Sequence, residues 1–413
     1  MPTTTQLERY AHLALTVGLN LQEGQPLVLG GSADSLPFLR ALTRAAYRLG
    51  ARAVAVEILD PEIARIGVEE VREAYLDELP DWFVRARLRA IEDGAALLTL
   101  ADDDPFAMKG VDPDRLGRRM QAAMRVRRPY LEQVGAHRVN WLAVGAATPG
   151  WARAVFPELE PQEATESLWQ AIFATVRLDA PDPEAAWRAH TARLEARARA
   201  LNEAHFEALL FEGPGTELRV GLAPRHVWKS AAAVAQNGVR FVPNLPTEEV
   251  FTAPDPERVE GVVRSTRPLN AAGTLVDGIE VAFAGGRAVR VRAERGEEAL
   301  RALLDTDAAA RRLGEVALVE TPNPVYATGL LFQSTLYDEN AASHIAFGRA
   351  YPDTLGIREG SDEALAAAGG NVSMLHLDWM IGSPEVDVWG ERGGERVPLM
   401  RRGRWVGDAD AAE

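Results

Sequence analysis

The stretch "QPLVLGGSADSLPFLRALTRAAYRLGARAVAVEIL", residues 25–59, decides the class of fold. Its apolar run at 25–31 is typical of a buried strand, and the amphipathic segment 32–50 is typical of a capped helix. A second apolar run at 51–59 completes strand, helix and strand within about 35 residues, the size of a βαβ unit. The stretch therefore predicts a parallel sheet covered by helices.

The rest of the first half repeats this alternation of strands and helices. "GAALLTLADDD" (94–104) and "VNWLAVGAAT" (139–148) supply further apolar strands, each followed by helical sequence. A charged helical stretch then runs from 161 to 204. We predict an α/β N-terminal domain, with a parallel sheet and helices, over residues 1–204.

The second half has a different pattern. "IEVAFAGGRAVRVRAE" (279–294) alternates apolar and polar residues and turns at Gly285–Gly286, as a β-hairpin does. "TELRVGL", "VALVE" and "ERVPLMRRGRWV" predict more strands, and a helix over 296–314 is expected to end at Gly314 as its C′ glycine. We predict a mainly antiparallel β, α+β C-terminal domain over 205–413, which carries the catalytic metal site.

Composition excludes several classes of protein. The 413-residue chain has no cysteine, which rules out disulfides, thiolate metal sites and a cysteine nucleophile. Its net charge is −15, and its densest basic segment, 118–130, is interpreted as the solvated face of a helix, so no nucleic-acid partner is expected. No run of about 18 apolar residues exists, so no membrane partner is expected. The N-terminus lacks a secretory pattern, and a cytoplasmic location is expected.

One predicted strand carries two polar residues that need explanation. In "NVSMLHLDWMIGS" (371–383), a two-residue repeat puts His376 and Asp378 together on one face, opposite an apolar face. The apolar face consists of Leu375, Leu377, Trp379 and Ile381. A buried aspartate without a counter-charge costs several kcal/mol, and no lysine or arginine lies within about ten residues. A divalent cation would neutralise Asp378 and use the neutral imidazole of His376, so the strand predicts metal ligands.

Other segments supply the remaining ligands of such a site. Glu249 lies in an extended stretch between prolines, Glu315 is expected at the first residue of a strand, and His344 opens the extended segment "HIAFG". Carboxylates and imidazoles without thiolates suit Zn²⁺, Co²⁺ or Mn²⁺ at catalytic sites, and two metals need a bridging carboxylate. The predicted ligands are Glu249, Glu315, His344, His376 and Asp378.

Three segments carry a resemblance to a known family. "LPTEEVFTAP", "ENAASHIAFGRAYP" and "MLHLDWMIGS" resemble the signature segments of the thermophilic aminopeptidase family of metallopeptidases, in the same order and with matching spacing. The resemblance implies that these five residues bind two divalent metal ions per chain and that Tyr351 is a ligand or a transition-state donor. It also implies broad release of N-terminal residues from peptide substrates, a preference for Zn²⁺ or Co²⁺ with Mn²⁺ and Mg²⁺ as further candidates, and a homodimer.

Within such a mechanism, we assign roles to individual residues. Glu315 is the expected bridging ligand. Glu339 is the candidate that takes the proton of the attacking water, with Glu248 as the second candidate. Tyr351 is expected to donate a hydrogen bond to the developing oxyanion.

Two other functions remain open on the sequence alone. A dinuclear amidohydrolase or phosphoesterase would use similar ligands, although such enzymes often show an H-x-H pair that this chain lacks. A non-catalytic peptide-binding protein with a structural metal belongs to a different class, and structural zinc commonly uses cysteine.

Overall fold

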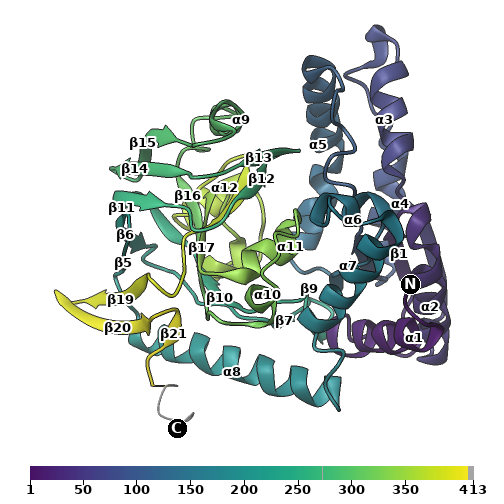
Figure 1. The fold of residues 1–413 in the computed structure, drawn as a ribbon, viewed down its shortest axis with the longest axis horizontal. Helices are drawn as coiled ribbons and strands as arrows, with labels where there is room; N and C mark the ends of the chain where they lie inside the picture. The colour runs from purple at the N-terminus through teal and green to yellow at the C-terminus, as the bar shows by residue number, and fades with distance from the viewer. Residues whose placement is uncertain (272, 408–413) are drawn as a thin grey trace. The chain divides into compact units, whose positions relative to one another are not determined.

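The computed structural model describes residues 1–271 and 273–407, and the chain divides into two compact units (Figure 1). The first comprises Met1–Trp187 with Ala232–Pro246, and the second comprises Arg188–Ala231 with Thr247–Glu413. Helix α8 (Pro183–Ala204) begins in the first unit and continues in the second. The division into folding domains at residues 204 and 205 stays a prediction.

The first unit is built on a five-stranded parallel sheet with the order β2-β1-β3-β4-β9. The predicted βαβ unit is present, since Leu27 of β1 pairs in parallel with Val54 of β2 across helix α2. The strands of this unit are β1 (Leu27–Gly31), β2 (Val54–Ile58), β3 (Ala96–Ala101), β4 (Trp141–Gly145), β7 (Ala233–Val234), β8 (Arg240–Phe241) and β9 (Asn244–Leu245).

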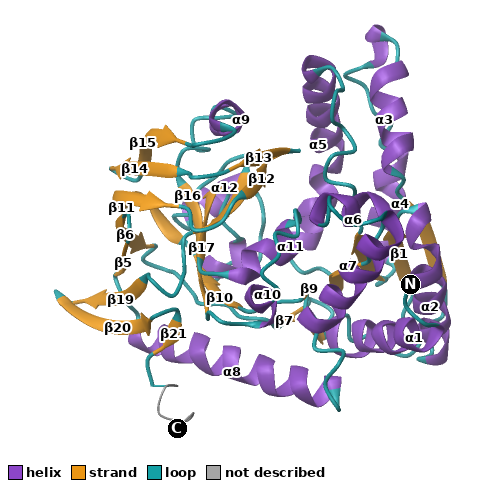
Figure 2. Cartoon of the chain, in the orientation of Figure 1, coloured by secondary structure: helices purple, strands orange, loops and turns teal. Residues whose placement is uncertain are grey.

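Helices alternate with the strands of this sheet, as the sequence predicts, and most of them pack around it (Figure 2). They are α1 (Thr4–Leu13), α2 (Leu36–Arg48), α3 (Pro61–Glu70), α4 (Trp82–Glu92), α5 (Pro113–Gly135), α6 (Pro149–Val155) and α7 (Pro161–Thr175). Tyr10 of α1 stacks on Phe38 of α2 at 4.8 Å between ring centroids, and Phe173 of α7 meets Tyr10 edge-on at 5.7 Å. These buried rings join three helices into one core.

The second unit contains two larger antiparallel sheets. One has four strands in the order β10-β16-β17-β18, namely β10 (Glu249–Thr252), β16 (Leu313–Val319), β17 (His344–Gly348) and β18 (His376–Met380). The other has the order β15-β14-β11-β6-β5-β19-β20-β21, with β5 (Ala208–Gly213), β6 (Thr216–Leu222), β11 (Pro254–Arg264), β14 (Glu280–Ala284), β15 (Arg287–Arg292), β19 (Asp387–Arg392), β20 (Glu395–Arg401) and β21 (Arg404–Trp405). The predicted fold class, a parallel α/β region followed by antiparallel β, is confirmed.

The remaining elements of this unit are short. They are the β12 (Leu269–Ala271) and β13 (Thr274–Val276) pair and helices α9 (Glu297–Leu304), α10 (Pro324–Ala327), α11 (Thr335–Asp338) and α12 (Asp362–Ala367). Two single turns of 3₁₀ helix, η4 (Glu339–Ala341) and η5 (Pro352–Leu355), flank strand β17. None of the helices among the described residues is long and apolar enough to cross a membrane.

The two sheets of the second unit meet through aromatic side chains. Phe347 of β17 stacks on Trp379 of β18 at 5.6 Å, and Phe283 of β14 lies 5.9 Å from Phe347. All three rings are buried. Because side chains alternate along a strand, the neighbours of Phe347 and Trp379 point to the other face of the four-stranded sheet.

The helix predicted over 296–314 is shorter than expected. It ends at Leu304, because the carboxylate of Asp307 accepts hydrogen bonds from the backbone N–H groups of Ala309 and Ala310 and holds that segment as a turn. Gly314 is therefore not a C′ glycine. It lies inside β16, where the pairing with β17 shifts by one residue between Leu313 and Glu315, as in a β-bulge.

This bulge requires glycine for a steric reason. A Cβ atom at Gly314 would lie 2.3 Å from the carbonyl oxygen of Gly348 and 2.4 Å from that of Arg349. The extra residue lets Leu313 pair with Phe347 and Glu315 pair with Ala346. Glu315, which was expected at the first residue of the strand, thus lies beyond the bulge, on the opposite face from Leu313.

Candidate metal centre

The predicted ligands come from all four strands of the four-stranded sheet. Glu249 lies on β10, Glu315 on β16, His344 on β17, and His376 and Asp378 on β18. The antiparallel register places Ala317 opposite His344, Glu315 opposite Ala346, and Ala346 opposite Asp378. All five ligand side chains therefore lie on the face that turns away from Phe347 and Trp379.

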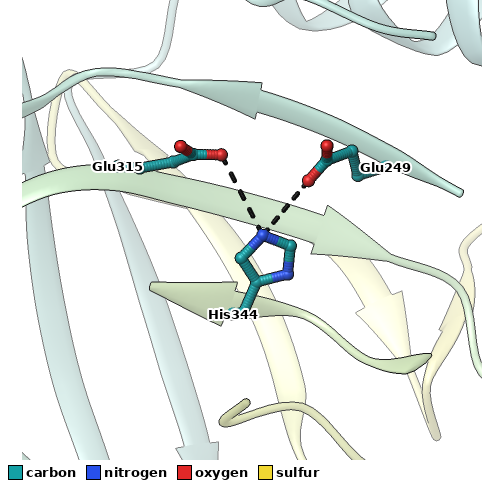
Figure 3. Close-up of side chains that lie close together, drawn as sticks. All are labelled: Glu249, Glu315 and His344. Carbon is teal, nitrogen blue, oxygen red and sulfur yellow. Dashed lines mark ion pairs between the residues drawn. The ribbon is translucent and has the colours of Figure 1, made fainter. Parts of the chain in front are cut away.

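Three of these side chains form a first cluster. Figure 3 shows the carboxylates of Glu249 and Glu315 pointing to the same nitrogen of His344, with Nε2 to oxygen distances of 3.1 and 3.9 Å. All three residues are buried. Apart from this 3.1 Å approach to each other, His344 Nε2 and Glu249 Oε2 have no hydrogen-bond partner among the described residues. Unpartnered buried ligand atoms that converge in this way fit a cation.

A second cluster shares Glu315 with the first. His376 Nε2 lies 3.5 Å from Glu315 Oε2 and 3.3 Å from Asp378 Oδ1. In each cluster one ligand atom from every residue lies within 4.8 Å of the others. Glu315 thus directs Oε1 to His344 and Oε2 to His376.

Backbone carbonyls orient both imidazoles. His344 Nδ1 lies 3.1 Å from the carbonyl oxygen of Ala342, and His376 Nδ1 lies 2.8 Å from that of Arg349. Each Nδ1–H donates to its carbonyl, so Nε2 faces the carboxylates, where it can pair with them as an N–H or bind a cation through its lone pair. This is the arrangement that metal-binding histidines usually adopt.

Without a cation, burial and neighbouring charges shift the pKa values of the acidic groups in these clusters. Burial, and then the charges of Asp378 and Glu249, raise the pKa of Glu315 well above its usual value. Burial also opposes ionisation of Asp378, but the neighbouring His376 outweighs it and lowers the pKa of Asp378. The ion pairs of these carboxylates among the described residues are all with the two histidines. The cluster therefore carries more acid than base, which fits divalent cations.

The two predicted catalytic residues lie in the segments that flank β17. Glu339, in η4, is half-buried, and burial together with the charges of Asp378 and Glu249 raises its pKa well above the usual value. The Tyr351 ring lies 4.8 Å from that of His376 and 6.2 Å from that of Phe251. Loss of water around the hydroxyl, and then the charges of Glu315 and Asp378, raise the pKa of Tyr351 well above 10. Although the residue is 41 % exposed, the negative neighbours alone require this direction.

Glu248, the second candidate for the base, lies elsewhere. Its carboxylate is buried 3.4 Å from His190 Nε2 of α8, whereas the alternation along β10 directs Glu249 to the other ligands. The structure therefore brings Glu339, and not Glu248, toward the charges of the predicted metal ligands.

Sequence reasoning missed two supporting residues. The Asn340 side chain accepts a hydrogen bond from the Glu248 N–H at 2.7 Å and donates to the Leu336 carbonyl at 2.9 Å, which ties η4 to the start of β10. Asp353 lies 4.0 Å from Lys229 Nζ, and its charge contributes to the raised pKa of Glu315. The sequence showed Asn340 beside Glu339 and Asp353 beside Tyr351, but no local pattern distinguished them from ordinary loop residues.

Known proteins are similar to this chain over almost its whole length. The family model described as "Thermophilic metalloprotease (M29)" matches residues 3–405. "Aminopeptidase T" of Thermus aquaticus is 52% identical over 404 residues, covering 98% of this chain and 99% of the relative. "Aminopeptidase 2" of Geobacillus stearothermophilus is 42% identical over 405 residues, covering 97% and 98%. The solved structure "Wild-type AmpT from Thermus thermophilus" superposes with a TM-score of 0.91 at 50% identity, covering 97% of this chain and 99% of that one.

The fold and the thiolate-free ligand set, together with these relatives, define a metal-dependent aminopeptidase, a hydrolase that acts on peptide bonds. The chain belongs to the thermophilic metalloprotease (M29) family. The alternative of a non-catalytic peptide-binding protein is therefore wrong, and the family favours peptides over phosphoesters as substrates.

Proposed function

We propose that this metalloaminopeptidase binds two divalent cations, with Glu315 as the bridging ligand, and releases N-terminal residues of broad identity from peptides. The observation that carries the proposal is the position of Glu315, whose two oxygens face two different histidines. Glu249 and His344 complete one ligand set, and His376 and Asp378 complete the other. Zn²⁺ or Co²⁺ suits these ligands best, and Mn²⁺ or Mg²⁺ is the alternative.

Different groups serve different steps of peptide hydrolysis. Two such cations, when bound, polarise the peptide carbonyl and lower the pKa of a water molecule from 15.7 toward about 7. Glu339, whose pKa is raised by burial and by the charges of Asp378 and Glu249 and which is therefore a stronger base than an exposed glutamate, takes the proton from the water and delivers it to the leaving amine. Tyr351, whose raised pKa keeps the hydroxyl protonated, donates a hydrogen bond to the oxyanion.

Acidic groups outside the ligand set support a preference for free N-termini. The α-amino group of a peptide has a pKa of about 7.7–8.0 and is largely cationic near neutral pH. Glu339 and Asp353 are acidic groups outside the ligand set whose charges reach the ligands. Acetylation of the substrate removes the charge that these groups attract.

A paired assay tests the proposed function. The protein is stripped of metal, its metal content is verified, and release of a fluorogenic leucyl amide is measured with added Zn²⁺ or Co²⁺ beside its N-acetylated form. We expect no release without metal, recovery at two ions per chain, and cleavage of the free-amine substrate alone. Full turnover after verified metal removal contradicts the mechanism, and equal cleavage of the acetylated substrate contradicts the requirement for a free amine. A panel of other aminoacyl amides measures how broad the preference is.

Tyr351→Phe is expected to keep both metal ions and to lower kcat. Loss of one oxyanion donor typically reduces the rate by about 10²- to 10³-fold. Metal content and kcat are measured together, with Tyr75→Phe, an exposed tyrosine of the first unit, as the control. If metal content falls in parallel with kcat, Tyr351 is a ligand instead of a donor.

We further propose that the protein forms a homodimer. Helices α3 and α5 pack against each other (Figure 1) and carry exposed apolar side chains. Ile63 and Ile66 are 69% and 48% exposed, and Met120 and Met124 are 51% and 46% exposed. Apolar groups that gather in this way mark interaction sites. Light scattering should give the mass of two chains at micromolar concentration, and a monomeric mass contradicts the proposal.

A cytoplasmic location stays a prediction that cell fractionation would test.

A further inference from the structure

The register of the four-stranded sheet places two alanines among the ligands. Along one row of paired residues, Glu315 of β16 faces Ala346 of β17, and Ala346 faces Asp378 of β18. Along the next row, Phe251 of β10 faces Ala317 of β16, and Ala317 faces His344. Both alanines point to the face that carries the ligands. Each is fully buried.

Ala346 lies at the centre of the second ligand cluster. Directly paired residues in an antiparallel sheet have Cβ atoms about 4.5–5.5 Å apart, so its methyl group lies between the side chains of Glu315 and Asp378. His376, which pairs with Gly348, lies one row farther along the same face. The three ligands of this cluster therefore surround a residue that has a single side-chain carbon.

Ala317 occupies the equivalent place in the first cluster. It pairs directly with His344 and lies on β16 between Glu315 and Val319, the partner of Glu249. Glu249, Glu315 and His344 therefore project around it, as Glu315, His376 and Asp378 project around Ala346. The two clusters share one carboxylate, but each has an alanine of its own beneath it.

We propose that Ala317 and Ala346 are the floors of the two metal sites, one for each ion, and that the size of the side chain at each position decides whether that ion binds. The inference rests on the proposed two-metal function. The ligand atoms of each cluster already lie within 4.8 Å of one another, and zinc requires bonds of about 2.0–2.2 Å to nitrogen and oxygen. Additional methyl groups on the floor push the ligands apart or fill the space that the ion needs.

Isoleucine at each position tests this inference. Ala346→Ile and Ala317→Ile introduce a side chain that favours β-strands, and each is expected to lower the metal content from two ions per chain to one. Metal is measured by mass spectrometry after equilibration with Zn²⁺, together with the melting temperature and kcat. The milder Ala346→Val and Ala317→Val variants are expected to weaken binding of the same ion, and they keep the test valid if an isoleucine variant does not fold. Ala346→Gly, which leaves the space open, is expected to retain both ions.

The matched control is Val316→Ile. Val316 is buried on the same strand as Ala317 but points to the opposite face, so overpacking there is expected to lower the melting temperature and leave two ions bound. The inference is wrong if folded Ala346→Ile and Ala317→Ile retain two ions and full kcat, or if Val316→Ile loses metal to the same extent. A wild-type protein with one ion would contradict the two-metal function separately. The floor inference would then predict loss of that ion in only one of the two isoleucine variants.

Discussion

Glu315→Gln is expected to abolish binding of both metal ions and all measurable peptide hydrolysis, while the metal-free protein melts at a higher temperature than the wild type. Both ligand clusters use this carboxylate, since Oε1 faces His344 and Oε2 faces His376. Removal of a mere supporting hydrogen bond costs about 10- to 100-fold in metal affinity, and loss of a shared ligand exceeds that. Apo stability rises because burial and neighbouring acids already raise the pKa of Glu315, so its ionised form is unfavourable without a cation.

Metal stoichiometry, and melting temperature with and without Zn²⁺, check this expectation. In the wild type, an ion at about 100 times its dissociation constant adds about 2.7 kcal/mol to the free energy of unfolding, and Glu315→Gln should lose this gain. The control is Glu320→Gln, which removes a carboxylate just beyond the same strand that pairs with Arg197 at 3.2 Å. The control should keep both ions. Unchanged metal content in Glu315→Gln contradicts the bridging assignment, and a less stable apo protein contradicts the expectation that the ionised carboxylate is unfavourable without a cation.

Asp378→Asn is expected to lose one metal ion and nearly all activity. In contrast to Glu315→Gln, its metal-free form is expected to melt at a lower temperature than the metal-free wild type. Asp378 belongs to only one of the two clusters, so Glu249, Glu315 and His344 remain to hold the other ion. Its carboxylate lies 3.3 Å from His376, which lowers the pKa of Asp378 despite burial. The ionised group therefore stabilises the apo fold, and its replacement should lower the apo melting temperature.

A comparison of Glu315→Gln with Asp378→Asn tests whether these two carboxylates bind metal or only stabilise the fold. Without metal, the ionised carboxylate of Glu315 is unfavourable, whereas that of Asp378 is paired with His376. The apo melting temperatures of the two variants should therefore move in opposite directions, while metal content falls in both. Asp387→Asn, on β19 of the other sheet, serves as control, because its carboxylate binds Arg401 and the N–H of Arg402. Normal metal content in Asp378→Asn beside a destabilised apo protein would make Asp378 a structural residue and would contradict the second ligand set.

Local pattern alone predicted much of the fold. The apolar runs around 25–59 predicted a βαβ unit, and β1, α2 and β2 form it with the expected parallel pairing. The alternation in 371–383 placed His376 and Asp378 on the same side of a strand and Trp379 on the other, as in β18. The glycine pair at 285–286 predicted the hairpin, and both residues have positive φ. These features depend on neighbours in sequence, because strand and helix periodicities are local properties.

The helix over 296–314 was mispredicted because its end depends on distant residues. Helical periodicity continues beyond Leu304, but the Asp307 carboxylate caps a turn and also accepts the N–H of Met374 at 2.8 Å. Gly314 resembles a helix-ending glycine in sequence, yet its lack of a side chain serves a close approach to the backbone at Gly348. No local pattern contains either contact.

The sequence by itself determined the chemical inventory: carboxylates and imidazoles without thiolates, with His376 and Asp378 on a common strand face. The tertiary structure alone decided which of the predicted ligands lie together in each cluster. That assignment depends on strand register, and the bulge at Gly314 sets the register by turning Glu315 to the ligand face opposite Ala346. Alternation repeats every two residues and can be counted along a chain, whereas register is a contact between segments about 30 residues apart or more, chosen by the packing of both faces.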